Sequence, residues 1–133
     1  MITLKIVTNA DIEFLFDLLK KRDPISNISH KKMPSYSQHI KFIKSKPYSK
    51  WYIILKENEK IGSIYLSKNN EIGLSILESK RTKNIQNLAL NELIKKNPRK
   101  RFLANINPKN KNLISFFKKN DFKLIQYTFE KIK

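Results

Sequence analysis

Residues 70–94 carry the pattern that most restricts how this chain can fold. Over residues 71–77 the apolar side chains alternate and then run together, which predicts a largely buried strand. From residue 84 onward the apolar side chains recur at intervals of three and four, the period of an amphipathic helix: Ile85, Leu88, Ala89, Leu93 and Ile94. A short polar and basic turn, residues 78–83, separates the two. The stretch therefore predicts a strand that turns within a few residues into a helix.

The start of that helix has the chemistry of an anion site. The first N–H groups of a helix lack partners within the helix and point along its dipole, so they attract negative charge. Lys80, Arg81 and Lys83 lie beside them in the sequence, and together these groups suit a phosphate. The alternative is an ordinary junction between a strand and a helix whose basic residues are simply solvated, since such junctions are common in α/β proteins. Spacing alone leaves both readings open.

The remaining chain fits one domain that covers residues 1–133. Strands are expected at residues 2–7, 51–56, 61–67, 102–106 and 124–129, and the second and third of these form a hairpin around the turn at 57–60. Helices are expected between Asn9 and Pro24, from Tyr36 to about Ser45, and after Asn110. Residues 22–34 have no period and contain two prolines, so we expect a loop that lies over any cleft.

The amino-acid composition limits the expected location of the protein and the kinds of metal or disulfide site it can contain. The chain has no cysteine, which excludes disulfides and thiolate metal sites and makes a reducing cytoplasm the expected location. Two histidines and scattered carboxylates predict no metal site. The first residues lack the layout of a signal peptide, and no apolar run is long enough to cross a bilayer, so no membrane partner is expected.

The formal net charge of +17 favours anionic partners such as nucleic acid or phosphorylated small molecules. Most of this charge is Lys spread along the chain, and Asn and Ile are also abundant. This usage is expected of a strongly AT-rich genome without any functional demand. We therefore regard nucleic-acid binding as possible but not favoured.

The turn at residues 81–86 resembles motif A of the GNAT superfamily of acyl-CoA N-acyltransferases, in which Arg or Gln is followed by a glycine-rich loop after a strand. Arg81 is present, whereas Asn84 and Gln86 stand where the family has glycine and Thr82 replaces a frequent third glycine. Family glycines allow the backbone to approach the CoA pyrophosphate. Asn tolerates unusual backbone angles, so Gln86, which adds a side chain at the point of close approach, is the larger departure.

Residues 104–122 resemble the later signature of the same family. Asn110 falls on the family's Asn, Phe117 on its frequent Tyr, and Asp121-Phe122 on its Gly-Phe turn. The resemblance covers nearly the whole chain and is loosest between residues 25 and 48. It implies an α/β (α+β) fold with a mixed, mainly antiparallel sheet of six to seven strands flanked by about four helices.

The resemblance also implies a set of site residues. Acetyl-CoA would be the co-substrate, with its pantetheine arm along Ser75, Ile76 and Leu77. Its phosphates would lie over the loop and near two later residues: Arg81, Thr82, Lys83, Asn84, Ile85, Gln86, Asn110 and Phe117. Glu71 and His30 are the candidate bases, although Glu71 also fits an exposed strand end, and His39 fits a core or boundary histidine better than a catalytic one. Phe117 cannot return a proton to the CoA sulfur as the family Tyr does; Tyr36, Tyr65, Ser115 or solvent would have to serve.

The resemblance leads to two functional hypotheses. The first is an N-acetyltransferase that moves an acetyl group from acetyl-CoA to a primary amine, either an amino-sugar nucleotide or another small amine, by direct attack. The second is a catalytically impaired GNAT-fold protein that binds an anionic ligand or nucleic acid. Asn110 and the strand-turn-helix layout support the first hypothesis, whereas the missing glycines and Phe117 support the second.

Overall fold

The computed structural model describes residues 1–22 and 33–133, which form one five-stranded sheet and four α-helices. The strands lie in the order β1-β2-β3-β4-β5. All neighbours are antiparallel except β4 and β5, which are parallel, so the sheet is mixed and mainly antiparallel as predicted. The strands are β1 (Ile2–Ile6), β2 (Lys50–Lys56), β3 (Glu59–Leu66), β4 (Glu71–Ile76) and β5 (Leu103–Ala104). The helices are α1 (Ile12–Lys20), α2 (Tyr36–Lys44), α3 (Lys83–Lys96) and α4 (Lys111–Lys119).

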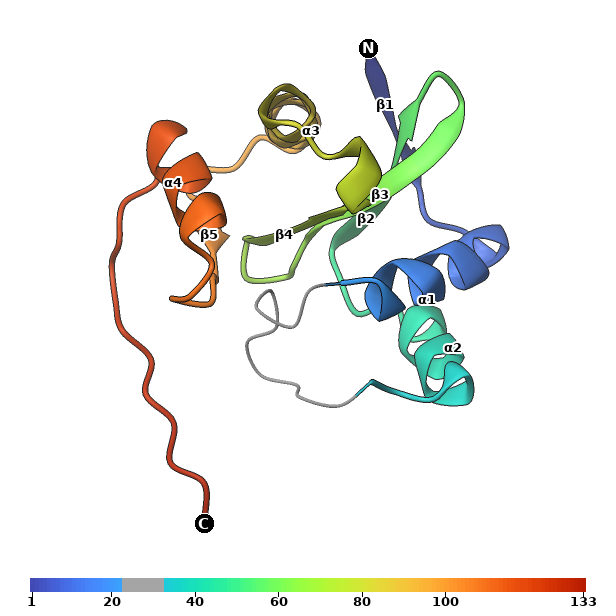
Figure 1. The fold of residues 1–133 in the computed structure, drawn as a ribbon, viewed down its shortest axis with the longest axis horizontal. Helices are drawn as coiled ribbons and strands as arrows, with labels where there is room; N and C mark the ends of the chain where they lie inside the picture. The colour runs from blue at the N-terminus through green and yellow to red at the C-terminus, as the bar shows by residue number, and fades with distance from the viewer. Residues whose placement is uncertain (23–32) are drawn as a thin grey trace.

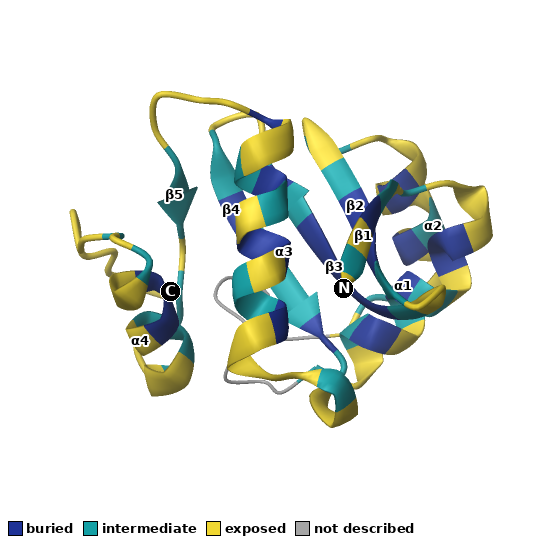
Figure 2. Ribbon diagram, turned by 90° about the horizontal axis from the view of Figure 1, so that it is seen from above, coloured by how far each residue is buried: buried dark blue, intermediate teal, exposed yellow. Residues whose placement is uncertain are grey.

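The helices cover both faces of the sheet (Figures 1 and 2). On one face α3 packs its buried side chains Ile85, Ala89, Leu90 and Leu93 against the sheet, and Phe116 and Phe117 of α4 join the same core. On the other face α1 and α2 enclose a second core: Ile12, Leu15, Ile43 and Ile53. The apolar spacing in the sequence thus corresponds to the buried side of each helix. No helix in the described part of the chain is long and apolar enough to span a bilayer.

Local chemistry explains the boundaries that the sequence predicted. The β2–β3 hairpin turns at Glu57 and Asn58, which both have positive φ (50° and 68°), as a two-residue turn requires. Thr82 caps α3 and Ser35 caps α2, each through its side-chain oxygen. The strand at 71–77 and the helix after residue 82 are confirmed, with a single 3₁₀ turn, Glu78–Lys80, between them.

The predicted last strand is wrong. Residues 123–133 form neither helix nor strand and are exposed throughout, so the described chain has five strands rather than six or seven. The strand expected at 102–106 shortens to Leu103–Ala104, because β5 pairs with β4 through only two residues before the chains diverge. The terminal strand β5 is therefore too short for the chain's own last segment to pair with it in a defined register. The loop predicted over the cleft lies largely at residues 23–32, outside the described residues.

Asp11 joins three elements at one buried point. Its carboxylate is 0% exposed and lies 2.7 Å from Lys5 Nζ of β1 and 2.8 Å from Lys60 Nζ of β3. The Thr8 backbone N–H also donates to it, at 2.8 Å, and Thr8 in turn caps the short 3₁₀ helix Asn9–Asp11 that leads into α1. Burial by itself raises the pKa of Asp11, but the hydrogen bonds from Lys5, Lys60 and Thr8 outweigh it and lower the pKa to about 2. Local sequence pattern does not reveal this role, because Lys60 is distant from Asp11 along the chain.

Asp11→Asn should lower the free energy of unfolding near neutral pH by about 1–3 kcal/mol, because it removes charged hydrogen bonds from a buried site. The folded pKa of Asp11 lies below the usual value of 3.8, so the contribution is present above about pH 4 and is lost as the pH falls toward 2. Urea unfolding of both proteins between pH 2 and 6 measures this. Asp17→Asn, the same change at an exposed position of α1, is the control and should alter stability little.

His39 is 5% exposed and packs its ring against Phe16, as expected of a core histidine. Burial lowers its pKa below the usual 6.5. A histidine with a depressed folded pKa stabilises the fold fully above pH 6.5, and this contribution is lost as the pH falls through the folded pKa. We expect the free energy of unfolding to fall between pH 7 and pH 5, and His39→Phe to flatten that slope. An unchanged slope in His39→Phe would show that another group titrates there.

Candidate functional site

A cavity opens where β4 and β5 part. The two strands are paired only at Glu71–Leu103 and Ile72–Ala104, so the later half of β4 has a sheet neighbour on one side only. A cavity of about 1380 Å³ occupies this side, between β4, the start of α3 and α4. Asn120 at the end of α4 donates to the side chain of Asn87 in α3 at 3.1 Å, which holds the two helices together beside the cavity.

The backbone of β4 presents unpaired groups to this opening. Alternate residues of a strand direct their N–H and C=O groups to opposite neighbours. Leu77 donates to Ile61 O and Glu71 accepts from Ser67 N, so the odd-numbered residues face β3. Asn70 accepts from Leu103 N, so the even-numbered residues face β5. Leu74 and Ile76 therefore direct their backbone groups into the gap, where an extended ligand with amide groups can pair with them.

The start of α3 supplies the anion-binding part of the cavity. Thr82 caps the helix by accepting from Ile85 N through its hydroxyl, at 3.1 Å, and from Gln86 N through its carbonyl, at 3.0 Å. The N–H groups of Lys83 and Asn84 in the first turn have no partner within the helix. These two amides, with the positive end of the helix dipole behind them, are the ones left for a phosphate.

The cavity lining is strongly basic. Seven cationic residues line it, from the end of α1, the start of α3 with the turn before it, and α4 with the residues before it: Lys21, Arg22, Arg81, Lys83, Lys109, Lys111 and Lys119. Among the described lining residues the only carboxylate is Glu78. Low-dielectric walls with charge of one sign raise the local concentration of the opposite ion. The site therefore suits a ligand with several phosphates. The described residues include no cluster of three His, Asp or Glu side chains suited to a metal.

The structure brings most of the predicted binding residues together. Lining the cavity are Ser75, Ile76, Leu77, Arg81, Thr82, Lys83, Gln86 and Asn110. The side chain of Asn110 is engaged as the cap of α4, where it accepts from Leu113 N at 3.3 Å. Asn84 is exposed and Ile85 is buried in the core, and neither is part of the described lining. His30 lies outside the described residues.

The two other predicted residues lie away from the cavity. Glu71 stands at the opposite end of β4, where its carboxylate accepts hydrogen bonds from Ser67 Oγ, at 3.1 Å, and from Asn105. Phe117 is 4% exposed and packs edge-on against Phe122, with ring centroids 4.9 Å apart. Its neighbour Phe116 lines the cavity instead. A base at Glu71 and a CoA contact at Phe117 remain predictions.

An aromatic group lies on the other side of β4, beneath α1 and α2. Tyr65 of β3 lies across Gly73, so closely that a Cβ at residue 73 would collide with its ring. Tyr48 stacks on Tyr65 with ring centroids 3.7 Å apart, and burial together with this hydrogen-bonded neighbour raises the pKa of Tyr48. Trp51 packs against Tyr48 and donates to Ser63 Oγ at 2.7 Å. This group fixes the middle of β4 from the face opposite α3.

Sequence reasoning missed the residues that the chain brings to the cavity from elsewhere. Four of these residues lie in segments where only the apolar side chains follow a recognisable period: Lys21, Lys109, Lys111 and Lys119. Glu78 was assigned to a turn. What these four lysines share is their position, since each stands at or near the end of a helix that borders the cavity. Lysines are so frequent in this chain that their spacing could not single these four out.

No protein-family model matches the sequence, and no curated protein matches it. Solved structures do match in shape. A domain from Methanocaldococcus jannaschii DSM 2661 superposes with a TM-score of 0.76 at 23% identity, over 98% of this chain and 93% of that one. RimL, a ribosomal L7/L12 alpha-N-protein acetyltransferase solved with coenzyme A, gives 0.73 at 18% identity, over 94% and 81%. The spermidine/spermine N-acetyltransferase SpeG from Vibrio cholerae gives 0.68 at 14% identity, over 89% and 77%.

These similarities agree with the sheet order, the single parallel pair and the divergence of β4 from β5. At such low identity they concern the arrangement of the backbone. The chain has the fold of the GNAT acetyltransferases.

Proposed function

We propose that this protein is an N-acetyltransferase that transfers an acetyl group from acetyl-CoA to a primary amine. One observation carries the proposal: the unpaired edge of β4 runs into the capped start of α3 within a single basic cavity. A pantetheine arm has amides for the first feature, and the pyrophosphate and 3′-phosphate of CoA have charge for the second. The fold shared with RimL, which was solved with coenzyme A, supports the same ligand.

In this proposal each part of the ligand has its own set of residues. The amides of pantetheine would pair with the backbone of Leu74 and Ile76, beside Ser75 and Leu77. The pyrophosphate would accept from the N–H group of Lys83 at the start of α3, with Arg81 beside it. Lys109, Lys111 and Lys119 on the α4 side would neutralise the remaining phosphate charge.

The transfer itself requires positioning and two proton movements. The neutral amine attacks the thioester carbonyl, a C–N bond forms, and the C–S bond breaks as the amine loses a proton and the sulfur gains one. Holding both reactants in one cavity supplies much of the rate enhancement. A thiol with a pKa near 8.5 needs little help to leave, which suits a site where Phe117 is buried and offers no hydroxyl. Glu71 and His30 remain the proposed bases.

The acceptor that fits best is a small primary amine that itself carries phosphate, such as an amino-sugar nucleotide. Lys21 and Arg22 at the end of α1 line the cavity alongside Leu77 and Glu78. Two cations at this position favour an acceptor with negative charge, and they disfavour a polycation such as the spermidine that SpeG acetylates.

Acetyl-CoA should raise the melting temperature of the pure protein. A ligand at about 100 times its dissociation constant adds about 2.7 kcal/mol to the free energy of unfolding. Differential scanning fluorimetry with acetyl-CoA, desulfo-CoA and adenosine measures this, and adenosine should act least because it lacks both the phosphates and pantetheine. The absence of any shift or calorimetric signal at millimolar acetyl-CoA would refute the transferase proposal. It would leave the alternative of a GNAT-fold protein that binds another anionic ligand.

Gln86→Gly should tighten acetyl-CoA binding if the side chain restricts approach to the start of α3, despite a cost to the helix of roughly 0.5–1 kcal/mol. Asn91→Gly carries the same helix cost at an exposed position of α3 that does not line the cavity, so it serves as the matched control. Calorimetry on both variants separates crowding from loss of helix. Equal affinities in wild type and Gln86→Gly would mean that Gln86 does not obstruct the ligand.

Arg81→Ala should weaken acetyl-CoA binding and reduce its dependence on salt, because one phosphate contact is lost. Arg99→Ala removes the same charge from an exposed loop beyond α3 and controls for the general field of the protein. Isothermal titration at two salt concentrations gives both quantities. Equal effects of the two substitutions would assign the role to net charge rather than to Arg81.

A further inference from the structure

The gap between β4 and β5, in which the proposed pantetheine arm would lie, is closed at one end. The two strands pair through Ile72 and Ala104, and beside this pair Asn105 donates to the Glu71 carboxylate. A ligand whose phosphates lie at the start of α3 and whose arm runs back along β4 therefore ends before Ile72. The stretch that the arm can follow, residues 73–77, measures roughly 13 Å at the usual rise of a strand. The thioester at the end of such an arm would lie at the closed end of the gap.

The two faces of β4 differ at this closed end. Ile72 and Ile76 are buried in the core that α3 covers, and Leu74 packs against the same core. Because successive residues of a strand point to opposite faces, Gly73 and Ser75 face the other side of the sheet, where α1 and α2 lie (Figure 1). The α3 face is filled by these apolar side chains, so an acyl group at the closed end of the gap is directed toward the face of α1 and α2.

Tyr65 covers that face at the closed end of the gap. It stands opposite Gly73 in the pairing of β3 with β4, and its ring reaches across to β4. The Cε2, Cζ and Oη atoms of Tyr65 occupy the space where a side chain at residue 73 would begin. A glycine at residue 73 leaves this space to the ring. The tyrosine of β3 therefore forms a wall over the end of the gap, in the place that a side chain of β4 would otherwise take.

Neighbouring side chains hold the ring of Tyr65 in place. Tyr48 stacks on it with ring centroids 3.7 Å apart and an interplanar angle of 4°. Trp51 packs edge-on against Tyr48 and is itself fixed by its hydrogen bond to Ser63 Oγ, at 2.7 Å. A closely packed group of this kind yields little to an additional methylene group, because overpacking forces side chains out of their preferred positions.

We propose that Tyr65, in the space that Gly73 leaves for it, limits the acyl group of the donor to acetyl. The inference rests on the proposed use of an acyl-CoA and names the donor that the site selects. A longer acyl chain meets the ring of Tyr65 where an acetyl group ends. The acceptor amine still has a route on the same face, because Ser75 lines the cavity together with Leu18 and Arg22 from the end of α1.

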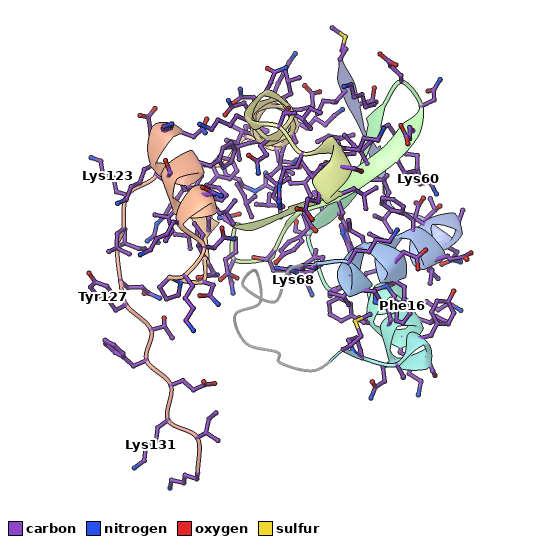
Figure 3. The ribbon with its side chains drawn as sticks, viewed as in Figure 1. Phe16, Lys60, Lys68, Lys123, Tyr127 and Lys131 are labelled. Carbon is purple, nitrogen blue, oxygen red and sulfur yellow. The ribbon has the colours of Figure 1, made fainter. Side chains whose placement is uncertain are left out.

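Calorimetric titration with CoA, acetyl-CoA, butyryl-CoA and hexanoyl-CoA tests the inference without knowledge of the acceptor. Wild type should bind butyryl-CoA at least about tenfold more weakly than acetyl-CoA, since a misfitting methylene group in a pocket costs about that factor. Tyr65→Ala removes the wall and should make the two affinities nearly equal. Tyr65→Phe keeps the ring and should keep the preference, which separates the role of the ring from that of the hydroxyl. Tyr127→Ala makes the same change on the segment that Figure 3 shows running away from the helices, and it should leave the preference unchanged.

CoA itself, which lacks an acyl group, controls for folding and for binding of the arm, and each variant should bind it as tightly as wild type does. Where Tyr65→Ala fails to bind CoA, Tyr65→Leu replaces it, because leucine fills part of the same space but is too short to reach across Gly73. Failure of wild type to bind CoA and acetyl-CoA would refute the proposed function. Normal CoA binding with equal affinity for all acyl chains in wild type, or a preference that survives in both Tyr65→Ala and Tyr65→Leu, would overturn the inference about Tyr65 alone.

Discussion

The divergence of β5 from β4 after two paired residues is the constraint on which the other features of the site depend. Buried backbone N–H and C=O groups need hydrogen-bonding partners, and β4 has neighbouring strands on both edges only along its first half. The second half keeps β3 on one side and leaves the backbone of Leu74 and Ile76 directed into the cavity. The cavity exists because two strands that begin together do not stay together. α3 starts just beyond the open half, so the unpaired amides of the helix and the strand lie in one continuous surface.

The positive charge around the cavity has a local role that the net charge of the chain does not reveal. Lysines are spread over the whole chain, and most of them are solvated in the ordinary way. Around the cavity, however, the fold brings together cations from residues 21, 22, 81, 83, 109, 111 and 119, against one carboxylate in the described lining. The fold thus converts an even distribution along the sequence into an uneven one in space. A CoA-like ligand would meet this field before it meets any specific hydrogen bond.

The sequence could predict elements whose signal is contained within a few residues. The period of residues 71–94 and the turn within residues 57–60 each depend on neighbours in the chain, and the structure has the strand, the helix and the turn where they were expected. Features that depend on distant contacts were out of reach. The burial of Asp11 requires Lys60, nearly fifty residues away, and the burial of Phe117 in the core that includes α3 depends on how α4 meets the sheet. The final segment has the residue types of a strand, but β5, the terminal strand at that side of the sheet, is only two residues long.

The single tryptophan gives this site an internal optical reporter. Trp51 donates to Ser63 of β3, and Ser63 stands opposite Ser75, a residue that lines the cavity on β4. Tyr48, whose ring lies 4.8 Å from that of Trp51, is close enough to pass it excitation energy. The indole is thus one strand away from the open edge and is held by a hydrogen bond that a shift of β3 against β4 would perturb. The intrinsic emission of this protein therefore reports on the strand where a ligand would pair, without a label and without competition from a second indole.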